Sequence, residues 1–159
     1  MTGECALFLD FDGVLAVPHT HPPVLFGGVA ETLRKLHADG FLLAVTSFNP
    51  EAEQALRNCG VAHLFCAMRC GSHDRWEGPY VPPEYELSKA NQIRSMLQHE
   101  LERDRGREFR FWFFDDSPAN VLDVESAELS GCRGAHLVDT NLGFTVADLH
   151  AVTRPTVNV

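Results

Sequence analysis

Short apolar runs of strand length alternate along the chain with segments whose apolar residues recur at helical spacing. The strand-length runs cover Cys5–Phe11, Phe41–Ser47, His63–Met68, Phe109–Phe114 and Ala135–Val138. Continuous apolar runs of this length are typical of strands that are buried on both faces. Strands that alternate with helices form parallel βαβ units. The sequence therefore predicts an α/β fold, a doubly wound (Rossmann-like) parallel sheet of five strands with helices on both faces.

Four helical segments and a terminal helical turn fill the intervals between the runs. The first helix is expected to stop at Gly40, a glycine just past the helix end. Asn49 would cap the second helix, with Pro50 at its first position. A third helix is expected from Ser88 onward, and Ser117 with Pro118 would open a fourth. The stretch TVADLH near the C-terminus is expected to form one turn of helix.

Composition sets limits on the class of protein. The chain has 159 residues, of which 45% are hydrophobic and 22% charged, so we expect one globular domain over residues 1–159. A net charge of −9 argues against general nucleic-acid binding, which needs clustered Lys and Arg. Without a signal peptide or a membrane-spanning run, a cytoplasmic location and no membrane contact are expected. Five cysteines, an odd number, are expected to be free thiols in a reducing compartment.

Polar side chains follow three of the predicted strands at the points where these strands end. The pairs are Asp10 with Asp12, Thr46 with Ser47, and Asp115 with Asp116. In an open parallel sheet, ligands bind outside the carboxyl ends of the strands. The three pairs are therefore expected to converge on one edge of the sheet.

Four carboxylates at one edge need a counter-charge. Like charges about 4 Å apart repel each other by several kcal/mol at intermediate dielectric. Ligands that are all oxygen suit Mg²⁺, which keeps several waters and takes few protein carboxylates. A magnesium ion held by acids at the ends of strands is expected to serve a phosphate site.

Four short motifs follow one another along the chain: LDFDGV, AVTSFN, SKANQI and FFDDSPAN. On these motifs the chain resembles the haloacid dehalogenase superfamily of phosphatases, from Leu7 to about His150. The resemblance implies a Mg²⁺-dependent phosphomonoester hydrolase that works through an aspartyl-phosphate. Each motif alone is weak, but four in family order on the right elements are specific.

The resemblance assigns roles residue by residue. Asp10 would be the nucleophile, and Asp12 would protonate the leaving oxygen and then activate water. Ser47 or Thr46 would hydrogen-bond the phosphoryl oxygens. Ser47 is preferred, since Thr46 is taken as the last strand residue. Lys89 would neutralise the charge of the nucleophile and of the phosphate together.

The metal site would take its ligands from two strand ends. Asp115 would bind Mg²⁺ directly, beside the Asp10 carboxylate and the backbone carbonyl of Asp12. Asn120 would lie just behind these ligands, and Asp116 would lie there too or act through water. Because family members that lack an acid at position 12 are dehalogenases or ATPases, the acid here implies hydrolysis or transfer of phosphate.

The intervals between the motifs are too short for the cap domain that many family members carry. The expected partner is a phosphorylated substrate, either a small molecule or a phosphoprotein. A capless member with an open site suits bulky substrates such as phosphoproteins or polymer ends, or a homo-oligomer whose partner subunit supplies a lid. The loop RCGSHDRWEGPYVPPEYEL is a candidate substrate wall through Arg75, Trp76 and Tyr80, and equally a plain surface loop.

Other interpretations use the same residues. A phosphotransferase of this fold, or an inactive module that binds a phospho-ligand or a protein, remains an alternative. A signalling receiver domain is disfavoured, because its acidic pair comes first and its lysine last, whereas Lys89 here precedes the late pair of acids. Structural zinc is a further alternative, with His63, Cys66, Cys70 and His73 as ligands. The irregular spacing favours buried free thiols instead.

Overall fold

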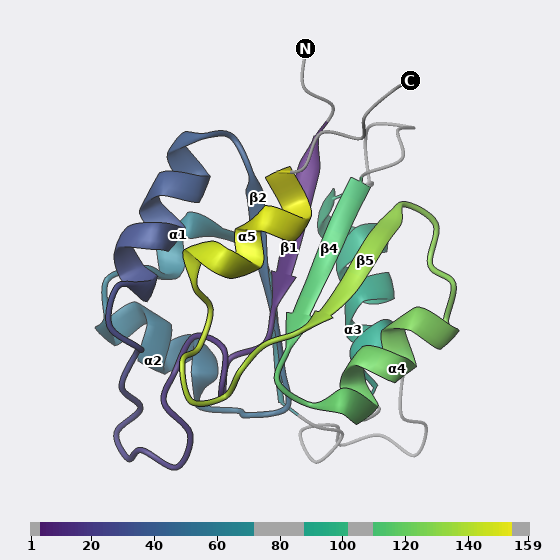
Figure 1. The fold of residues 1–159 in the computed structure, drawn as a ribbon. Coiled ribbons are helices and arrows are strands. Elements are labelled where there is room, and N and C mark those ends of the chain that lie inside the picture. The colour runs from purple at the N-terminus through teal and green to yellow at the C-terminus, as the bar shows by residue number, and fades with distance from the viewer. Residues whose placement is uncertain (1–3, 72–87, 102–109, 154–159) are drawn as a thin grey trace.

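Five parallel strands form one sheet in the computed structural model, which describes residues 4–71, 88–101 and 110–153. The strands lie in the order β3-β2-β1-β4-β5 (Figure 1). They are β1 (Cys5–Leu9), β2 (Leu42–Ser47), β3 (Phe65–Cys70), β4 (Arg110–Asp115) and β5 (Cys132–Leu137). The chain builds outward from the central β1 to one side and then to the other, so the order reverses there. This reversal is where doubly wound sheets bind ligands.

Helices cover both faces of the sheet, as the sequence predicts (Figure 1). One layer holds α1 (Val29–Ala38), α2 (Ala52–Asn58) and α5 (Val146–Thr153). The other holds α4 (Pro118–Ser126) and α3 (Lys89–Met96), which continues into the π-helical turn η4 (Leu97–Leu101). Among the described residues, no helix has both the length and the apolar character needed to span a bilayer.

The hydrophobic core has two layers, one on each face of the sheet, because successive side chains of a strand point to opposite faces. In β1, Leu7 and Leu9 pack in the layer of α1 and α2, whereas Ala6 and Phe8 pack in the layer of α3 and α4. All four side chains are fully buried. Phe8 also meets the ring of Phe111 edge to face, with centroids 5.1 Å apart. Burial on both faces explains why the strands are continuous apolar runs.

Two helix ends predicted from residues next to the helix are confirmed, the end of α1 and the start of α4. Gly40 has a φ of 93°, its N–H donates to the carbonyl of His37, and Phe41 donates to that of Leu36. This is the pattern of a helix closed by a left-handed glycine. Ser117 caps α4 by accepting from the Asn120 N–H at 3.4 Å.

The region before β3 differs from the prediction of a strand over His63–Met68. A short 3₁₀ turn, η1 (Ala62–Leu64), comes first, and β3 runs from Phe65 to Cys70. The turn places the side chain of Leu64 in the core, and the Leu64 N–H donates to the carbonyl of Val61. Pairing with β2 starts only at Phe65, which lies opposite Leu43. A buried turn and a buried strand give the same short apolar run, so periodicity could not separate them.

Candidate active site

A tight loop follows β1 and carries the first pair of acids. The N–H of Asp10 donates to the carbonyl of Phe114 at 3.0 Å, which keeps Asp10 in line with the sheet. The carbonyl of the buried Phe11 then accepts the N–H groups of Leu15 and Ala16, both at 2.9 Å. This turn carries Asp12 away from the strand, and its side chain is half-buried.

Gly13 lets this loop approach the end of β4. Its φ is 80°, and a Cβ atom added there would lie 2.2 Å from Asp116 Oδ2. It would also lie 2.9 Å from Thr140 Oγ1 in the segment after β5. A glycine is therefore required by both its backbone conformation and the space available.

Lys89 joins the three strand ends. It is the first residue of α3, and its side chain is 1% exposed. Its Nζ lies 2.7 Å from Asp10 Oδ1 and 3.3 Å from Asp115 Oδ2, and it also donates to the backbone carbonyl of Thr46. The ring of Phe48 lies below it, 4.8 Å from Nζ. The convergence expected from the sequence is thus present in the structure.

A contact between helices sets the position of Lys89. Ser88 caps α3 by accepting from the Asn91 N–H, and its own hydroxyl donates to Asp123 Oδ2 on α4 at 3.0 Å. The same carboxylate oxygen accepts the Ala90 N–H at 3.2 Å. Asp123 was missed by sequence reasoning, because no local pattern marks a cap that another helix supplies.

Asp115 is held from several sides in a fully buried position. Its Oδ1 accepts the Ser117 N–H at 2.8 Å, and its Oδ2 accepts from Asn120 Nδ2 at 3.1 Å. Asn120 therefore contacts Asp115, an expected metal ligand, directly.

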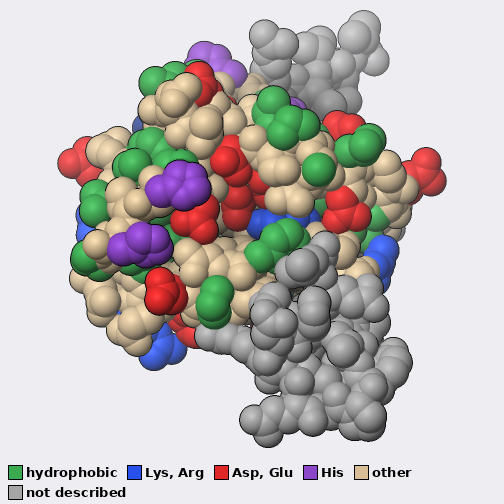
Figure 2. Space-filling view, turned by 90° about the horizontal axis from the view of Figure 1, so that it is seen from below, with side chains coloured by type: hydrophobic (Ala, Val, Ile, Leu, Met, Phe, Trp, Pro, Cys, Tyr) green, Lys and Arg blue, Asp and Glu red, His purple; other side chains and the backbone are tan. Residues whose placement is uncertain are grey.

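The acids at this edge form a cluster that suits a cation. Asp10, Asp115 and Asp116 can each offer an oxygen within 4.8 Å of the others. Figure 2 looks onto the carboxyl ends of the strands and shows acidic side chains gathered near the middle of this face. Asp116 was expected to lie behind the metal ligands or to act through water, and its carboxylate lies in the same group as those of Asp10 and Asp115.

The electrostatics of the cluster agree with that geometry. Burial raises the pKa of Asp10 to about 8, with Lys89 opposing the rise and Asp115 adding to it. Burial also raises the pKa of Asp115, again against Lys89. One ammonium therefore does not offset the buried carboxylates, and the residues present fit an added divalent cation.

The polar end of β2 supplies further groups. Thr46 Oγ1 is buried and has no hydrogen-bond partner among the described residues. Ser47 Oγ accepts the N–H of Asn49 at 3.0 Å. The Nδ2 of Asn49 donates to Asp12 Oδ2 at 3.1 Å, a contact that sequence reasoning missed. Asn49 was interpreted as the cap of the second helix, and its Oδ1 does accept the Glu51 N–H at 2.9 Å, although α2 itself begins at Ala52 with Glu51 as its cap residue.

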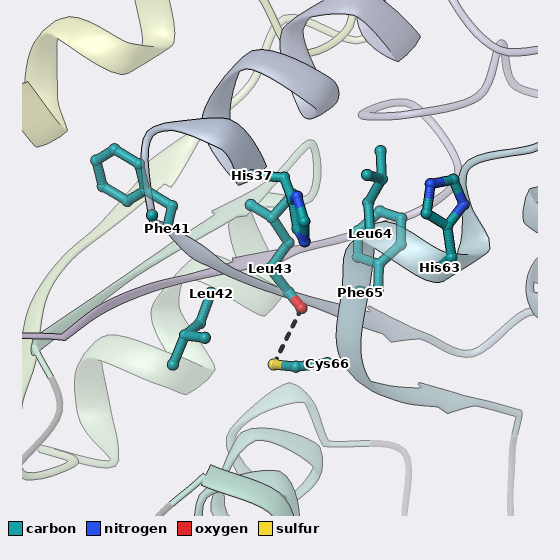
Figure 3. A pocket seen from close by; sticks show the side chains of 9 residues that line it. His37, Phe41, Leu42, Leu43, His63, Leu64, Phe65 and Cys66 are labelled. Carbon is teal, nitrogen blue, oxygen red and sulfur yellow. Dashed lines mark hydrogen bonds between the residues drawn. The ribbon is translucent and has the colours of Figure 1, made fainter.

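A pocket of about 240 Å³ lies at the opposite end of the sheet. It is formed by the segment from the end of α1 into β2 and by the start of β3, with His37, His63 and Cys66 in its wall (Figure 3). Cys66 is exposed and its Sγ donates to the Leu43 carbonyl, while Cys70 is half-buried. The expectation of buried thiols is therefore wrong for Cys66.

The expected zinc ligands are not gathered in the described part of the chain. There, Asp10, Asp115 and Asp116 are the only three acids, histidines or cysteines close enough to share a metal ion. The fourth expected zinc ligand, His73, lies outside the described residues. The expected substrate-loop residues Arg75, Trp76 and Tyr80 lie outside them as well.

Known structures share this arrangement of strands and helices. Neither family models nor curated proteins give a match to the sequence. A hydrolase of the haloacid dehalogenase-like family from Streptococcus pneumoniae matches with a TM-score of 0.63 and 15% identity, over 98% of this chain and 93% of that chain. A proposed HAD-like phosphatase from Mesorhizobium loti matches with a TM-score of 0.57 and 18% identity, over 87% and 74%.

A third structure matches at the size of a core domain. It is the core domain of a proposed phosphoglycolate phosphatase from Streptococcus pneumoniae, with a TM-score of 0.57 and 14% identity, over 95% of this chain and 96% of that chain. The chain therefore has the fold of the haloacid dehalogenase-like hydrolases, as its four sequence motifs predict.

Proposed function

We propose that the protein is a Mg²⁺-dependent phosphomonoester hydrolase in which Asp10 is the nucleophile. The observation that carries the proposal is the position of Lys89, whose Nζ lies between the carboxylates of Asp10 and Asp115 at the carboxyl edge of the sheet. A buried ammonium between two acids is suited to a reaction that adds the negative charge of a phosphate to the site.

The acidic cluster supports the choice of magnesium. The carboxylates of Asp10, Asp115 and Asp116, with the backbone carbonyl of Asp12, would hold the ion, and Asn120 would keep Asp115 in place. Bound Mg²⁺ would supply the positive charge that offsets these carboxylates and a phosphoryl group.

The hydrogen bonds of Asp10 indicate which of its oxygens attacks. Both the Phe11 N–H and Lys89 Nζ donate to Oδ1, at 2.8 and 2.7 Å. Oδ2 accepts no hydrogen bond from the described residues and is the oxygen we assign to attack. Its electron pair forms the bond to phosphorus while the bond from phosphorus to the leaving oxygen breaks, which gives an aspartyl-phosphate on Asp10.

Asp12 would act as general acid in the first half-reaction and as general base in the second. It gives its proton to the departing oxygen in the first step and takes a proton from water in the second. The water oxygen then bonds to phosphorus, the bond to Asp10 breaks, and inorganic phosphate leaves. The turn after Phe11 supports this role, because it separates Asp12 from the strand that holds Asp10.

Thr46, rather than the Ser47 preferred from sequence, is the hydroxyl that we assign to the phosphoryl oxygens. The register of β1 and β2 pairs Leu9 with Val45, so Thr46 comes next to Asp10. Thr46 also follows Ala44 by two residues and so shares the face on which Lys89 lies. The buried Oγ1 of Thr46 has no hydrogen-bond partner in the described part of the chain, whereas Ser47 Oγ already accepts the N–H of Asn49.

The short segment between β1 and β2 supports a range of phosphorylated substrates, because it leaves no room for a cap domain there. Between β1 and β2, residues 10–41 form only a flap and α1, and no cap domain is inserted there. The flap is held by bridges from Ala16 to Asp12 and to Leu25.

A phosphate-release assay tests the proposal. Purified protein with Mg²⁺ should hydrolyse p-nitrophenyl phosphate, and both EDTA and Asp10→Asn should abolish this activity. Asp39→Asn, the same change at the exposed cap of α1, serves as the matched control and should keep it. Absence of turnover on a broad panel of phosphomonoesters would reject the enzyme interpretation.

A further inference from the structure

We infer that Asn49 is a positioning residue that orients Asp12, so that Asp12 delivers its proton to the leaving group from Oδ1. The inference rests on the proposed function, because it concerns the acid of the same reaction. Asn49 is the last residue of the AVTSFN motif, but the resemblance gave it no role in the reaction.

Three hydrogen bonds hold Asn49 in one orientation. Its backbone N–H donates to Ser47 Oγ at 3.0 Å. Its side-chain Oδ1 accepts the Glu51 N–H at 2.9 Å, and its Nδ2 donates to Asp12 Oδ2 at 3.1 Å. A backbone N–H can only donate, so the amide oxygen must face Glu51. The amide nitrogen must then face Asp12, and the two ends of the amide cannot be exchanged without losing both contacts.

This orientation determines which oxygen of Asp12 carries a proton. An amide N–H is a donor only, so Asp12 Oδ2 has to act as the acceptor in this contact. A protonated carboxyl accepts better through its carbonyl oxygen than through its hydroxyl oxygen, so this contact favours the proton of Asp12 on Oδ1. Among the described residues, only Asn49 donates a hydrogen bond to the Asp12 side chain, so this contact fixes the direction in which Oδ1 points.

Loss of this contact should affect leaving groups unequally. A poor leaving group, such as an alkoxide, needs a proton as it departs, whereas a dinitrophenolate departs without one. A misdirected Asp12 should therefore slow alkyl phosphomonoesters and spare 2,4-dinitrophenyl phosphate. A merely structural role for Asn49, at the start of α2, would slow both substrates alike.

The experiment compares kcat/KM for β-glycerol phosphate and for 2,4-dinitrophenyl phosphate in Mg²⁺. This quantity covers only the steps up to departure of the leaving group, so the later attack of water does not enter. The main variant is Asn49→Ser, because serine can still accept the Glu51 N–H in a turn but is too short to reach Asp12. Asn58→Ser, near the other end of α2, is the matched control.

We expect Asn49→Ser to lower kcat/KM for β-glycerol phosphate by about 10- to 100-fold, part of the ~10²–10⁴-fold that a general acid contributes. The value for 2,4-dinitrophenyl phosphate should fall by less than about 3-fold, and Asn58→Ser should change neither. If Asn49→Ser does not fold, Asn49→Asp keeps the size and the acceptor, lacks the amide donor, and should show the same selectivity.

Two results for Asn49→Ser would overturn the inference. Equal losses on the two substrates would make Asn49 a structural residue, and no loss on either would remove it from the reaction. A wild-type protein that hydrolyses neither substrate would reject the proposed function, and the inference with it. A wild type that is active and loses activity in Asp10→Asn keeps the proposed function, whatever Asn49 does.

Discussion

Lys89 shows how strongly a single residue in this site depends on its neighbours. Its ammonium is buried between Asp10 and Asp115, and each of these carboxylates has a pKa raised by burial. Removing the cation would leave two acids facing each other in the core. The sequence could suggest this lysine through its motif, but it could not reveal that the side chain is almost fully buried.

Lys89→Met should therefore abolish hydrolysis and also destabilise the fold. Removing one partner of a buried ion pair costs about 3–5 kcal/mol, because the remaining charge loses its compensation. Urea unfolding at pH 8 without Mg²⁺ measures the loss, and Lys35→Met on the exposed side of α1 is the matched control. An unchanged free energy of unfolding would show that Lys89 does not neutralise the two acids.

The raised pKa of Asp10 predicts how pH and Mg²⁺ act together. The folded protein holds a proton on Asp10 up to about pH 8, whereas the unfolded chain releases it near 3.8. The contribution of Asp10 to stability in the metal-free protein should therefore decrease as the pH rises from about 4 to about 8. Mg²⁺ competes with that proton, so its stabilising effect should grow with pH.

Thermal unfolding at pH 6 and pH 8, with and without Mg²⁺, checks this coupling. The rise in melting temperature on adding Mg²⁺ should be larger at pH 8, and Asp10→Asn should reduce the difference between the two values. An equal rise at both pH values in the wild type would argue against Asp10 as a ligand.

Among the elements, α3 carries Lys89 at its first position, and a hydrogen-bonded contact from α4 fixes where α3 begins. Caps within a segment, such as Ser117 for α4, could be predicted because the signal and the helix are adjacent in sequence. The tie from Asp123 to Ser88 and Ala90 joins residues about 35 positions apart and could not. The short 3₁₀ turn before β3 was predicted as strand for a different reason, because a buried turn and a buried strand give the same short apolar run.

Asp123→Ala should weaken both stability and catalysis through α3. It removes the acceptor of the Ser88 hydroxyl and of the Ala90 N–H, and losing a cap of this kind costs about 1 kcal/mol. Because Lys89 lies between these two residues, kcat with p-nitrophenyl phosphate should fall as well. Glu125→Ala, an exposed position on the same helix, is the control for both measurements. A loss of stability with unchanged kcat would separate the cap from the position of Lys89.

At the level of the whole molecule, the two ends of the sheet differ in chemistry. The acids, Lys89 and Thr46 gather at the carboxyl ends of the strands, whereas the pocket with His37 and His63 lies at the amino ends of β2 and β3. Alternation of strands and helices was enough to predict this polarity, because parallel strands all end on the same side. The strand order and the contacts between the ends needed the structure.

Substitutions at the two ends of the sheet should therefore differ in their effect on activity. Thr46→Val keeps the shape of the side chain and removes a hydroxyl that has no partner among the described residues, so stability should be unchanged or higher. Its kcat/KM for p-nitrophenyl phosphate should fall by about 10- to 100-fold, the worth of a hydrogen bond to a charged group. His63→Ala in the distant pocket should leave activity within about 2-fold of wild type, since it touches none of these groups. A large loss in His63→Ala, or none in Thr46→Val, would contradict the assignment of the active edge.

Direct detection of the phosphorylated enzyme is the most decisive measurement, because the proposed function depends on Asp10 as the nucleophile. Protein that is turning over 2,4-dinitrophenyl phosphate in Mg²⁺ would be quenched in acid, digested, and its peptides analysed by mass spectrometry. We predict a phosphoryl group on the peptide that contains Asp10, and its absence in Asp10→Asn. Turnover with no phosphorylated peptide, or with the phosphoryl group on another residue, would contradict the proposed role of Asp10.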